Sequence, residues 1–309
     1  MHDQETVLLQ GHIIDSLILA KVLDTILMMG GTFDIQDMQI GKTREESSRA
    51  RITVRASSAK LLSEIVHAIQ PHGASVESER NCRLIAAPAD GIFPDEFYAT
   101  THLPTQVRVR DQWLEVAGIE MDLGIRVDPV TLTAHTIPMG EVTQGDLIVT
   151  GREGVRVIPL QRPRDRDVFS FMASQVSSER PHGHIIGDVA KRLMQLRAGF
   201  REGKAGCKVL LAGGPAIVHA GGREALTWLV DEAFIHVLFC GNALPAHDME
   251  VDLYGTSLGY GHAAGRVVPH GHEHHLRTIN RIRAIGSIEA AVTSGVIKTG
   301  IMAACVRRG

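Results

Sequence analysis

The sequence lacks the features that mark secreted, membrane-spanning and nucleic-acid-binding proteins. Its 309 residues include four cysteines, which stand far apart without CxxC spacing, so neither a disulfide framework nor a zinc site is predicted. No apolar run reaches the roughly 18 residues of a membrane span, and the N-terminus has no signal-peptide pattern. The net charge of −3 comes without a basic face, so we expect no nucleic-acid partner. These absences predict a cytoplasmic protein in a reducing compartment.

The composition is that of an ordinary globular chain. Hydrophobic residues make up 44% and charged residues 22%, enough to build a normal core, and the length suits two or three domains. The 16 histidines are many for such a chain, and they cluster late in the sequence.

Residues 1–90 alternate between short strands and helices. Apolar residues recur at helical spacing in two segments, and glycine or proline ends each of them. Ile52, Val54 and Ala56 alternate with polar residues, as in a half-buried strand. The order β-α-β-β-α-β predicts a ferredoxin-like α+β domain. Its elements are expected near residues 7–13, 19–26, 33–40, 51–56, 61–69 and 83–86.

Residues 91–160 predict a small β-rich domain. Strand-like pieces are separated by turn signals such as Asp128-Pro129, and no amphipathic helix stands between them. We expect a barrel or sandwich whose strands lie near residues 106–109, 124–127, 147–150 and 155–158. The charged, proline-containing stretch at 161–167 is expected to be a linker.

Residues 168–309 predict a Rossmann-like parallel α/β domain. Two apolar segments, 207–212 and 237–240, run directly into glycine turns that feed helices, a pattern typical of a parallel sheet. A helix is expected over 287–308, and no further strand follows it. We therefore expect an α/β protein whose last domain is incomplete at its C-terminus.

Backbone groups at the ends of the two parallel strands are candidate cofactor contacts. Gly213 and Gly214 stand where a phosphate would meet a helix N-terminus, since glycine lets the backbone approach a ligand closely. Gly241, Asn242 and Ala243 follow the next strand, at the edge where open parallel sheets bind ligands. The pattern is not GxGxxG, so tight turns without a ligand remain the alternative.

Polar residues near the same edge are candidate catalytic and substrate contacts. His247 beside Asp248 offers a base tuned near neutral pH, but adjacent helical residues diverge, so one of them can be a cap. Arg180 suits either a bidentate grip on a carboxylate or a helix cap, and Ser257 offers a hydroxyl in a loop. The histidine-rich segment around His275 suits polar contacts or a solvated helix start better than a metal, and no metal site is predicted.

Several strings of residues resemble one known family, in the same order along nearly the whole chain. Among them are Gly213-Gly214-Pro215-Ala216, Gly241-Asn242-Ala243-Leu244, Tyr254-Gly255-Thr256-Ser257 and Gly271-His272-Glu273-His274-His275. The sequence is similar to the archaeal-type ornithine cyclodeaminases, which carry the lysine-oxoglutarate reductase/saccharopine dehydrogenase region. That family also forms the C-terminal part of cyanobacterial arginine dihydrolase/ornithine cyclodeaminase fusions. The resemblance implies NAD as cofactor, conversion of L-ornithine to L-proline and ammonia, and a C-terminal fold akin to deoxyhypusine synthase.

The resemblance also bears on single residues and on the chain's extent. It implies nucleotide contacts at Asn242 and Ala243 and a base at Asp248 or His247. Family members continue past the position of Gly309, so it implies a truncated chain that binds NAD weakly, is inactive or needs a partner. The alternatives are a saccharopine- or lysine-type amino-acid dehydrogenase and a non-catalytic ligand-binding or assembly module. The ferredoxin-like domain predicts a homo-oligomer.

Overall fold

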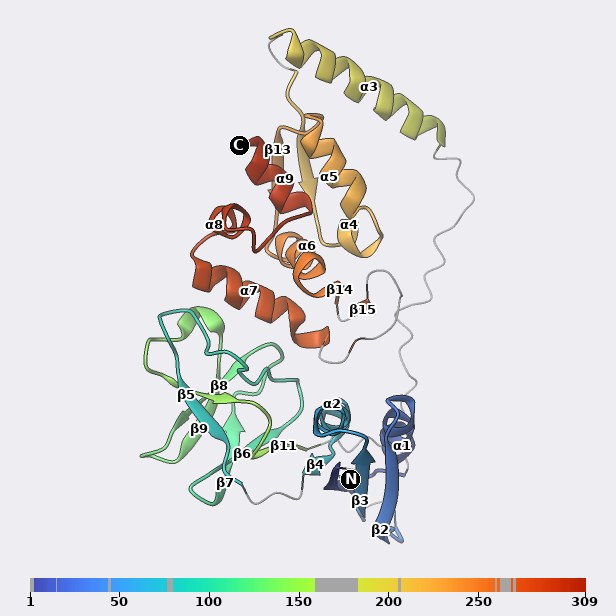
Figure 1. The fold of residues 1–309 in the computed structure, drawn as a ribbon, viewed down its shortest axis with the longest axis vertical. Coiled ribbons are helices and arrows are strands. Elements are labelled where there is room, and N and C mark those ends of the chain that lie inside the picture. The colour runs from blue at the N-terminus through green and yellow to red at the C-terminus, as the bar shows by residue number, and fades with distance from the viewer. Residues whose placement is uncertain are drawn as a thin grey trace. The chain divides into compact units, whose positions relative to one another are not determined.

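The protein, seen in a computed structural model, divides into two units, Met1–Arg166 and Asp167–Gly309 (Figure 1). The structure describes residues 3–14, 16–43, 46–76, 80–158, 183–204, 207–258, 260–261, 268 and 271–309. The linker expected at 161–167 and the candidate Arg180 lie outside the described residues. No helix among the described residues is long and apolar enough to cross a membrane.

An antiparallel four-stranded sheet and two helices open the first unit. The elements are β1 (Asp3–Gly11), α1 (Ile18–Met28), β2 (Thr32–Gln39), β3 (Ser48–Ala56), α2 (Ala59–Ile69), η1 (Gln70–His72) and β4 (Ser75–Val76). The sheet order is β2-β3-β1-β4, and the predicted β-α-β-β-α-β order is confirmed. Inward side chains of β1 and β3, such as Val7 and Ile52, share one buried core with Ile26 and Ile65 of the helices. Both helices therefore cover the same face of the sheet.

The strand predicted at Arg83–Ala86 exists, but its assignment to this first sheet is wrong. This strand, β5, pairs antiparallel with Leu147–Thr150 in the second sheet. The fourth strand of the first sheet is instead β4, whose Val76 stands opposite Val7 of β1. Alternating hydrophobicity marks a strand but does not identify its partner, which here lies far along the chain.

A seven-stranded sheet completes the first unit. Its strands are β5 (Arg83–Ala86), β6 (Thr105–Val109), β7 (Gln112–Ala117), β8 (Gly124–Asp128), β9 (Thr133–Ile137), β10 (Leu147–Thr150) and β11 (Val155–Val157), with the turn η2 (Met139–Glu141). The order is β11-β6-β7-β9-β8-β10-β5, and only the β7–β9 pairing is parallel among the pairings described. The four expected strands are confirmed, whereas β7 and β9 were not predicted.

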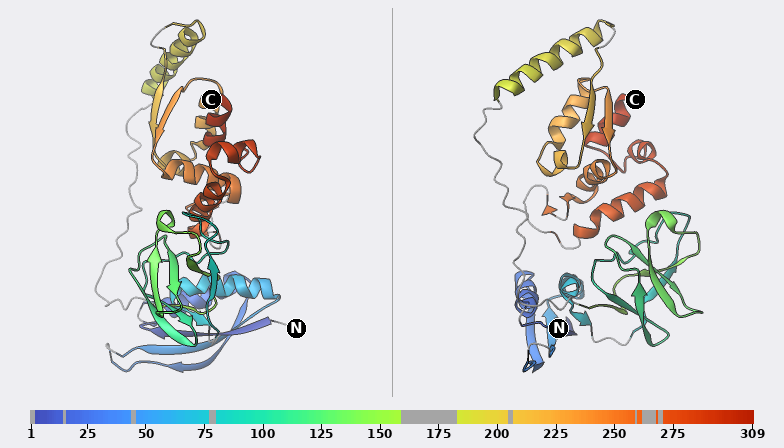
Figure 2. Two further views of the ribbon diagram at one scale, coloured as in Figure 1. Left: turned by 90° about the vertical axis from the view of Figure 1, so that its left-hand side faces the viewer. Right: turned by 180° about the vertical axis from the view of Figure 1, so that it is seen from behind.

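The second unit is built around two parallel strands, β12 (Leu210–Gly213) and β13 (Val237–Cys240). Its helices are α3 (Gly183–Arg201), α4 (Ala216–His219), α5 (Arg223–Asp231), α6 (Ala243–Tyr254), α7 (His274–Ile285), α8 (Ile288–Thr293) and α9 (Ile301–Arg308), with β14 (Thr256–Ser257), β15 (Tyr260–Gly261) and η3 (Gly271–Glu273). Val218, Leu226, Leu244 and Ile301 bring α4, α5, α6 and α9 into one core. Figure 2 shows these helices as a layer on one side of the two strands.

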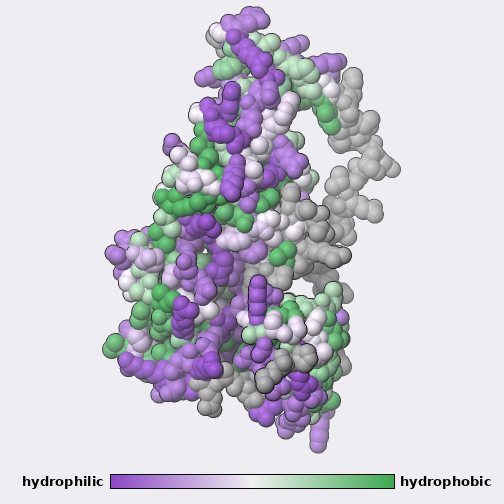
Figure 3. Space-filling model, viewed as in Figure 1, coloured by the Kyte–Doolittle hydropathy of each residue, from purple (hydrophilic) through white to green (hydrophobic). Residues whose placement is uncertain are grey.

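Helix α3 joins the rest of this unit through its C-terminal half. Arg197 pairs with Glu232 and stacks over Phe234, with its guanidinium carbon 4.4 Å from the ring centre. The N-terminal half instead exposes apolar side chains, including Ile185 and Ile186. Hydrophobic and hydrophilic residues are interspersed on the face of the molecule that Figure 3 shows.

The prediction of a single helix over residues 287–308 is wrong. Two helices, α8 and α9, occupy this segment and are separated by residues 294–300. Gly295 and Gly300 have φ of 75° and 102°, which helical residues do not adopt and glycine tolerates. The break lets α9 turn back onto α5, and its start becomes part of a polar network described below.

Candidate functional site

The carboxyl ends of β12 and β13 lie side by side at one edge of the sheet. The parallel register places Gly213 opposite Cys240, so the turns after the two strands begin at the same level. An open hollow runs along this edge and is lined by Ala212, Gly213, Leu238, Phe239, Cys240 and Gly241. This is the place where open parallel sheets bind ligands.

The glycines at this edge differ in how much space surrounds them. A Cβ added to Gly213 would stand 2.8 Å from Cδ1 of Ile217, so a larger residue here would have to displace the end of that side chain. At Gly214 and Gly241, by contrast, no heavy atom lies within 4 Å of an added Cβ. Their backbone is open to the close approach of a ligand, which fits the predicted dinucleotide edge.

Helix α6 begins at the same edge. Asn242, its N-cap residue, is exposed, and its side chain makes no capping bond to the helix. The first turn, which starts at Ala243, therefore presents backbone N–H groups beside an uncommitted amide. Such a helix start attracts anions because its N–H groups and its dipole both favour negative charge.

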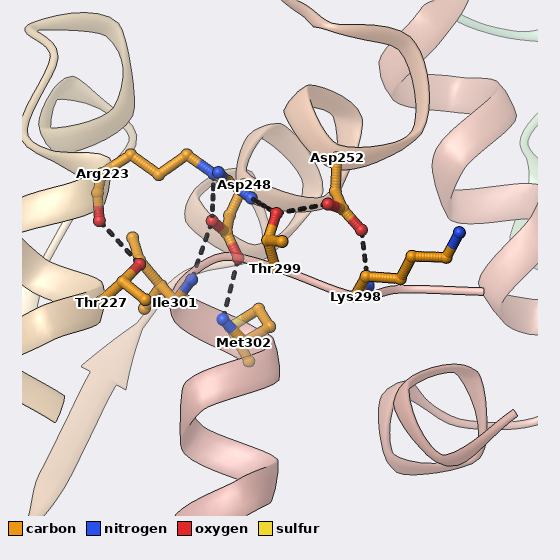
Figure 4. A network of polar contacts seen from close by, with 8 residues as sticks. All are labelled: Arg223, Thr227, Asp248, Asp252, Lys298, Thr299, Ile301 and Met302. Atoms are coloured by element: carbon orange, nitrogen blue, oxygen red, sulfur yellow. Dashed lines mark hydrogen bonds and ion pairs between the residues drawn. The ribbon is translucent and has the colours of Figure 1, made fainter. Parts of the chain in front are cut away.

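Asp248 lies on α6 but faces the packed interior of the unit (Figure 4). Its side chain is fully buried, and Oδ1 accepts hydrogen bonds from Nε of Arg223 at 2.8 Å and from the Ile301 N–H at 3.0 Å. Oδ2 accepts the Met302 N–H at 2.8 Å. Burial raises the pKa of this carboxyl, while the two N–H groups and the guanidinium oppose that rise. The contacts are those of an anchor that ties α9 to α5 and α6.

Asp252 extends the same network one turn later along α6. It accepts the Lys298 N–H at 2.7 Å and the hydroxyl of Thr299, which in turn accepts a hydrogen bond from Arg223 (Figure 4). Asp252 thus holds the end of the segment between α8 and α9, and Asp248 holds the first turn of α9.

His247 points to a different neighbourhood, a polar cluster that we call the histidine cluster: His219, His247, Glu250, Thr256, Ser257, His274 and His275. Nδ1 of His247 lies 2.8 Å from Oε2 of Glu250. Oε1 of Glu250 accepts the Thr256 hydroxyl at 2.8 Å, and that hydroxyl oxygen lies 2.7 Å from Nδ1 of His274. Glu250 is fully buried, so two histidines depend on one enclosed carboxylate.

Two further histidines flank His247. Its ring centre lies 4.7 Å from that of His219 and 5.9 Å from that of His275. Nδ1 of His219 lies 2.7 Å from the Ser257 hydroxyl oxygen. The cluster therefore brings together α4, α6, β14 and α7 within the second unit.

Burial favours the neutral form of two rings in the cluster. Burial lowers the pKa of His219, with a further lowering by His247 and an opposing effect of Glu250. Burial also lowers the pKa of His274, against the carboxylates Glu250 and Glu273. Neutral imidazoles are proton acceptors, so these rings can serve as bases. In the described part of the chain, no three or more His, Cys, Asp or Glu side chains are arranged so that they could hold a metal ion.

The predicted site residues within the described part of the chain lie in three different places. Gly213, Gly214, Gly241, Asn242 and Ala243 share the strand edge, and His247, Ser257 and His275 share the histidine cluster, while Asp248 lies in the anchoring network. Sequence analysis did not single out His219 or Glu250, and it considered His274 only as part of the histidine-rich segment around His275. One available signal was the i,i+3 spacing of His247 and Glu250, which places both on one helix face.

Family comparisons cover almost the whole chain. Residues 4–103 match the LOR/SDH bifunctional enzyme conserved region, and 104–186 match the first region of the C-terminal part of ArgZ-like arginine dihydrolases. Residues 187–309 match the Rossmann-fold region of the same proteins. The Rossmann-like prediction for the C-terminal part is thereby confirmed.

Curated relatives settle the family. An ornithine cyclodeaminase of Methanothermobacter thermautotrophicus is 45% identical over 300 residues, which are 97% of this chain and 72% of that protein. The chain belongs to the archaeal-type ornithine cyclodeaminase family. Another member of the wider group, the bifunctional arginine dihydrolase/ornithine cyclodeaminase AgrE of Nostoc sp., is 36% identical over 306 residues, 97% of this chain and 43% of that protein.

A solved structure of an ornithine cyclodeaminase relative has the same fold. AgrE, in its ternary complex with ornithine and NAD⁺, matches with a TM-score of 0.78 at 34% identity. The match covers 99% of this chain and 42% of that chain, so this chain spans less than half of the fusion protein.

Proposed function

We propose that this chain catalyses the NAD-dependent conversion of L-ornithine to L-proline and ammonia. The observation that carries the proposal is the course of helix α6. It begins at the open strand edge with Asn242 and reaches His247 five residues later, about 7.5 Å along the helix axis. One rigid element thus joins the candidate cofactor edge to a candidate base. The AgrE complex with ornithine and NAD⁺ supports the same chemistry for the family.

The ends of β12 and β13 would hold the cofactor. The open backbone at Gly214 and Gly241 and the N–H groups after Ala243 suit a pyrophosphate, and the exposed Asn242 amide suits a ribose or carboxamide. Gly213 supports this edge by letting α4 pack beneath it. When bound, the cofactor would supply a reversible hydride acceptor for the α-carbon of the substrate, without net consumption.

Of the two candidate bases we choose His247. Asp248 already accepts three hydrogen bonds from Arg223 and the start of α9, whereas His247 lies among Ser257 and His275, our candidate substrate contacts. Arg180, outside the described residues, remains our candidate for the substrate carboxylate. In this scheme His247 accepts a proton from a substrate amino group, which frees the nitrogen lone pair for imine formation or ring closure.

The direct test is incubation of the chain with ornithine and substoichiometric NAD⁺, followed by assays of proline, ammonia and NADH. We expect proline and ammonia in equal amounts, without accumulation of NADH. Net NADH would indicate a saccharopine- or lysine-type dehydrogenase instead. Amino-acid binding without any product would indicate a ligand-binding module and overturn the proposal.

Asn242→Ala tests the cofactor edge. Because the side chain is exposed and caps nothing in α6, we expect weaker NAD⁺ binding by calorimetry with a melting temperature close to that of the parent chain. Unchanged NAD⁺ affinity would remove Asn242 from the site. Asp24→Ala, an exposed change on α1 in the first unit, is the control.

The proposal also covers the cellular location of the chain and its oligomeric state. None of the four cysteines forms a disulfide, which supports a cytoplasmic location. We also infer self-association through the ferredoxin-like part, a common dimerisation scaffold. Light scattering of the purified chain should give a multiple of 33.6 kDa, and a monomeric mass would exclude self-association under those conditions.

A further inference from the structure

The protons of the histidine cluster can be placed by counting donors and acceptors around Glu250. A carboxylate has no hydrogen to give, so the contact between Glu250 and Nδ1 of His247 needs a hydrogen on that nitrogen. The single hydroxyl hydrogen of Thr256 points to the other oxygen of Glu250. The same hydroxyl oxygen can then only accept from His274, so Nδ1 of His274 also carries a hydrogen.

A neutral imidazole carries one ring hydrogen. In the neutral form of His247 or His274 this one hydrogen lies on Nδ1, so Nε2 keeps its lone pair and is the basic atom. The contacts of one buried carboxylate therefore select the same tautomer in two histidines that come from different helices, α6 and α7. Tyr254 further orients His274 by stacking, with ring centres 4.5 Å apart and planes at 15°.

We propose that Glu250 is a positioning residue that sets this tautomer in both rings, and that His247 and His274 act as separate bases for the two amino groups of a diamine substrate. The second half of this inference rests on the function proposed above. Glu250 was not a candidate from the sequence, His274 was considered only within the histidine-rich segment, and their placement together follows only from the fold.

The chemistry of a diamine requires two proton acceptors. The α-ammonium group must lose a proton before the α-carbon can give up a hydride, because the freed lone pair forms the C=N bond. The δ-ammonium group must lose a proton before its nitrogen can attack that carbon and close the ring. After ring closure, the ring nitrogen gives one proton to the amino group, which leaves as ammonia. The hydride would then return to the α-carbon, and the protons held by the two bases would pass to the ammonia and to the ring nitrogen. Atoms and charge balance, and both bases end in their starting form.

The tautomers can be measured without substrate or cofactor. In the chain labelled with ¹⁵N-histidine, two-bond ¹H–¹⁵N spectra distinguish protonated from unprotonated ring nitrogens, and single His→Gln variants assign the signals. We expect Nδ1–H and a bare Nε2 for both His247 and His274. Glu250→Gln offers one acceptor and one donor in place of two acceptors, so at least one ring should change tautomer. Unprotonated Nδ1 in both rings, or spectra unaltered by Glu250→Gln, would overturn the positioning role.

Thr256→Val distinguishes the effect of Glu250 on His274 from its effect on His247. It removes the hydroxyl that connects Glu250 to His274 while nearly preserving shape, so the signals of His274 should change and those of His247 should not. Glu224→Gln, an identical change on the exposed face of α5, is the control and should alter neither ring.

Measurements of turnover test the second part of the proposal, that His247 and His274 are separate bases. We expect His247→Gln and His274→Gln each to lower kcat by about 10²- to 10⁴-fold, the usual worth of a general base, with smaller effects on KM. Parental kcat in either variant would refute separate bases while leaving the tautomer result intact. Absence of proline formation by the parent chain would refute the proposed function, and the spectra would still decide the role of Glu250.

Discussion

Replacing Asp248 by asparagine distinguishes an anchor from a base. The carboxylate is fully buried and accepts two backbone N–H groups of α9 and Nε of Arg223, whose own side chain is 10% exposed. Asparagine keeps one acceptor oxygen but turns an NH₂ group toward a donor and leaves the guanidinium without its counter-charge. Removing one partner of a buried ion pair costs about 3–5 kcal/mol.

This loss should appear in the unfolding of the second unit. Trp228 lies on α5 and Trp113 on β7 of the first unit, so a Trp113→Phe background makes Trp228 the fluorescent reporter. With a urea m-value of about 2 kcal/mol per molar, a 3 kcal/mol loss lowers the midpoint by about 1.5 M. Asp252→Asn is the matched control, because its bonds are exposed and should contribute about 1 kcal/mol.

The urea midpoint and the activity of the Asp248→Asn variant together distinguish a structural role of Asp248 from a catalytic one. A large midpoint shift accompanied by a parallel loss of activity supports the anchor. An unchanged midpoint with activity abolished would refute our reasoning and restore Asp248 as the catalytic base.

Two further predictions concern the strand edge and pH. Gly213→Ala should destabilise the second unit by about 1 kcal/mol, because the end of the Ile217 side chain must shift to admit the new methyl group. Gly214→Ala should leave stability nearly unchanged and weaken NAD⁺ binding. Equal midpoints of the two variants in urea would contradict this. Burial lowers the pKa of His219 and His274 in the folded state, so the unfolded chain binds protons first and stability falls as pH drops below about 6.5. His219→Gln should flatten that decline in urea midpoints between pH 7 and pH 5, and an unaltered slope would contradict the assignment.

Local chemistry accounts for the parts of the fold that sequence analysis predicted correctly. The alternation at Ile52 and Val54 identified a strand, and Ser58 caps α2 by accepting the Leu61 N–H at 3.2 Å. The apolar run at 237–240 is strand β13 with those bounds. Each of these features depends on neighbours within a few residues.

The site was predicted only in part, because its contacts connect distant segments. The glycine turns correctly placed an open edge at Gly214 and Gly241, yet the cluster around His247 needs His219 and His274, which no spacing rule connects to it.

By itself the sequence determined the order of elements, the open turns after two parallel strands and the family. The tertiary structure determined which side chains and backbone groups surround each of two adjacent residues, His247 and Asp248. His247 and Asp248 differ by about 100° around α6, so one joins a histidine cluster and the other caps a helix 53 residues away. Long-range packing selects those partners, and burial then decides which groups hold or accept a proton.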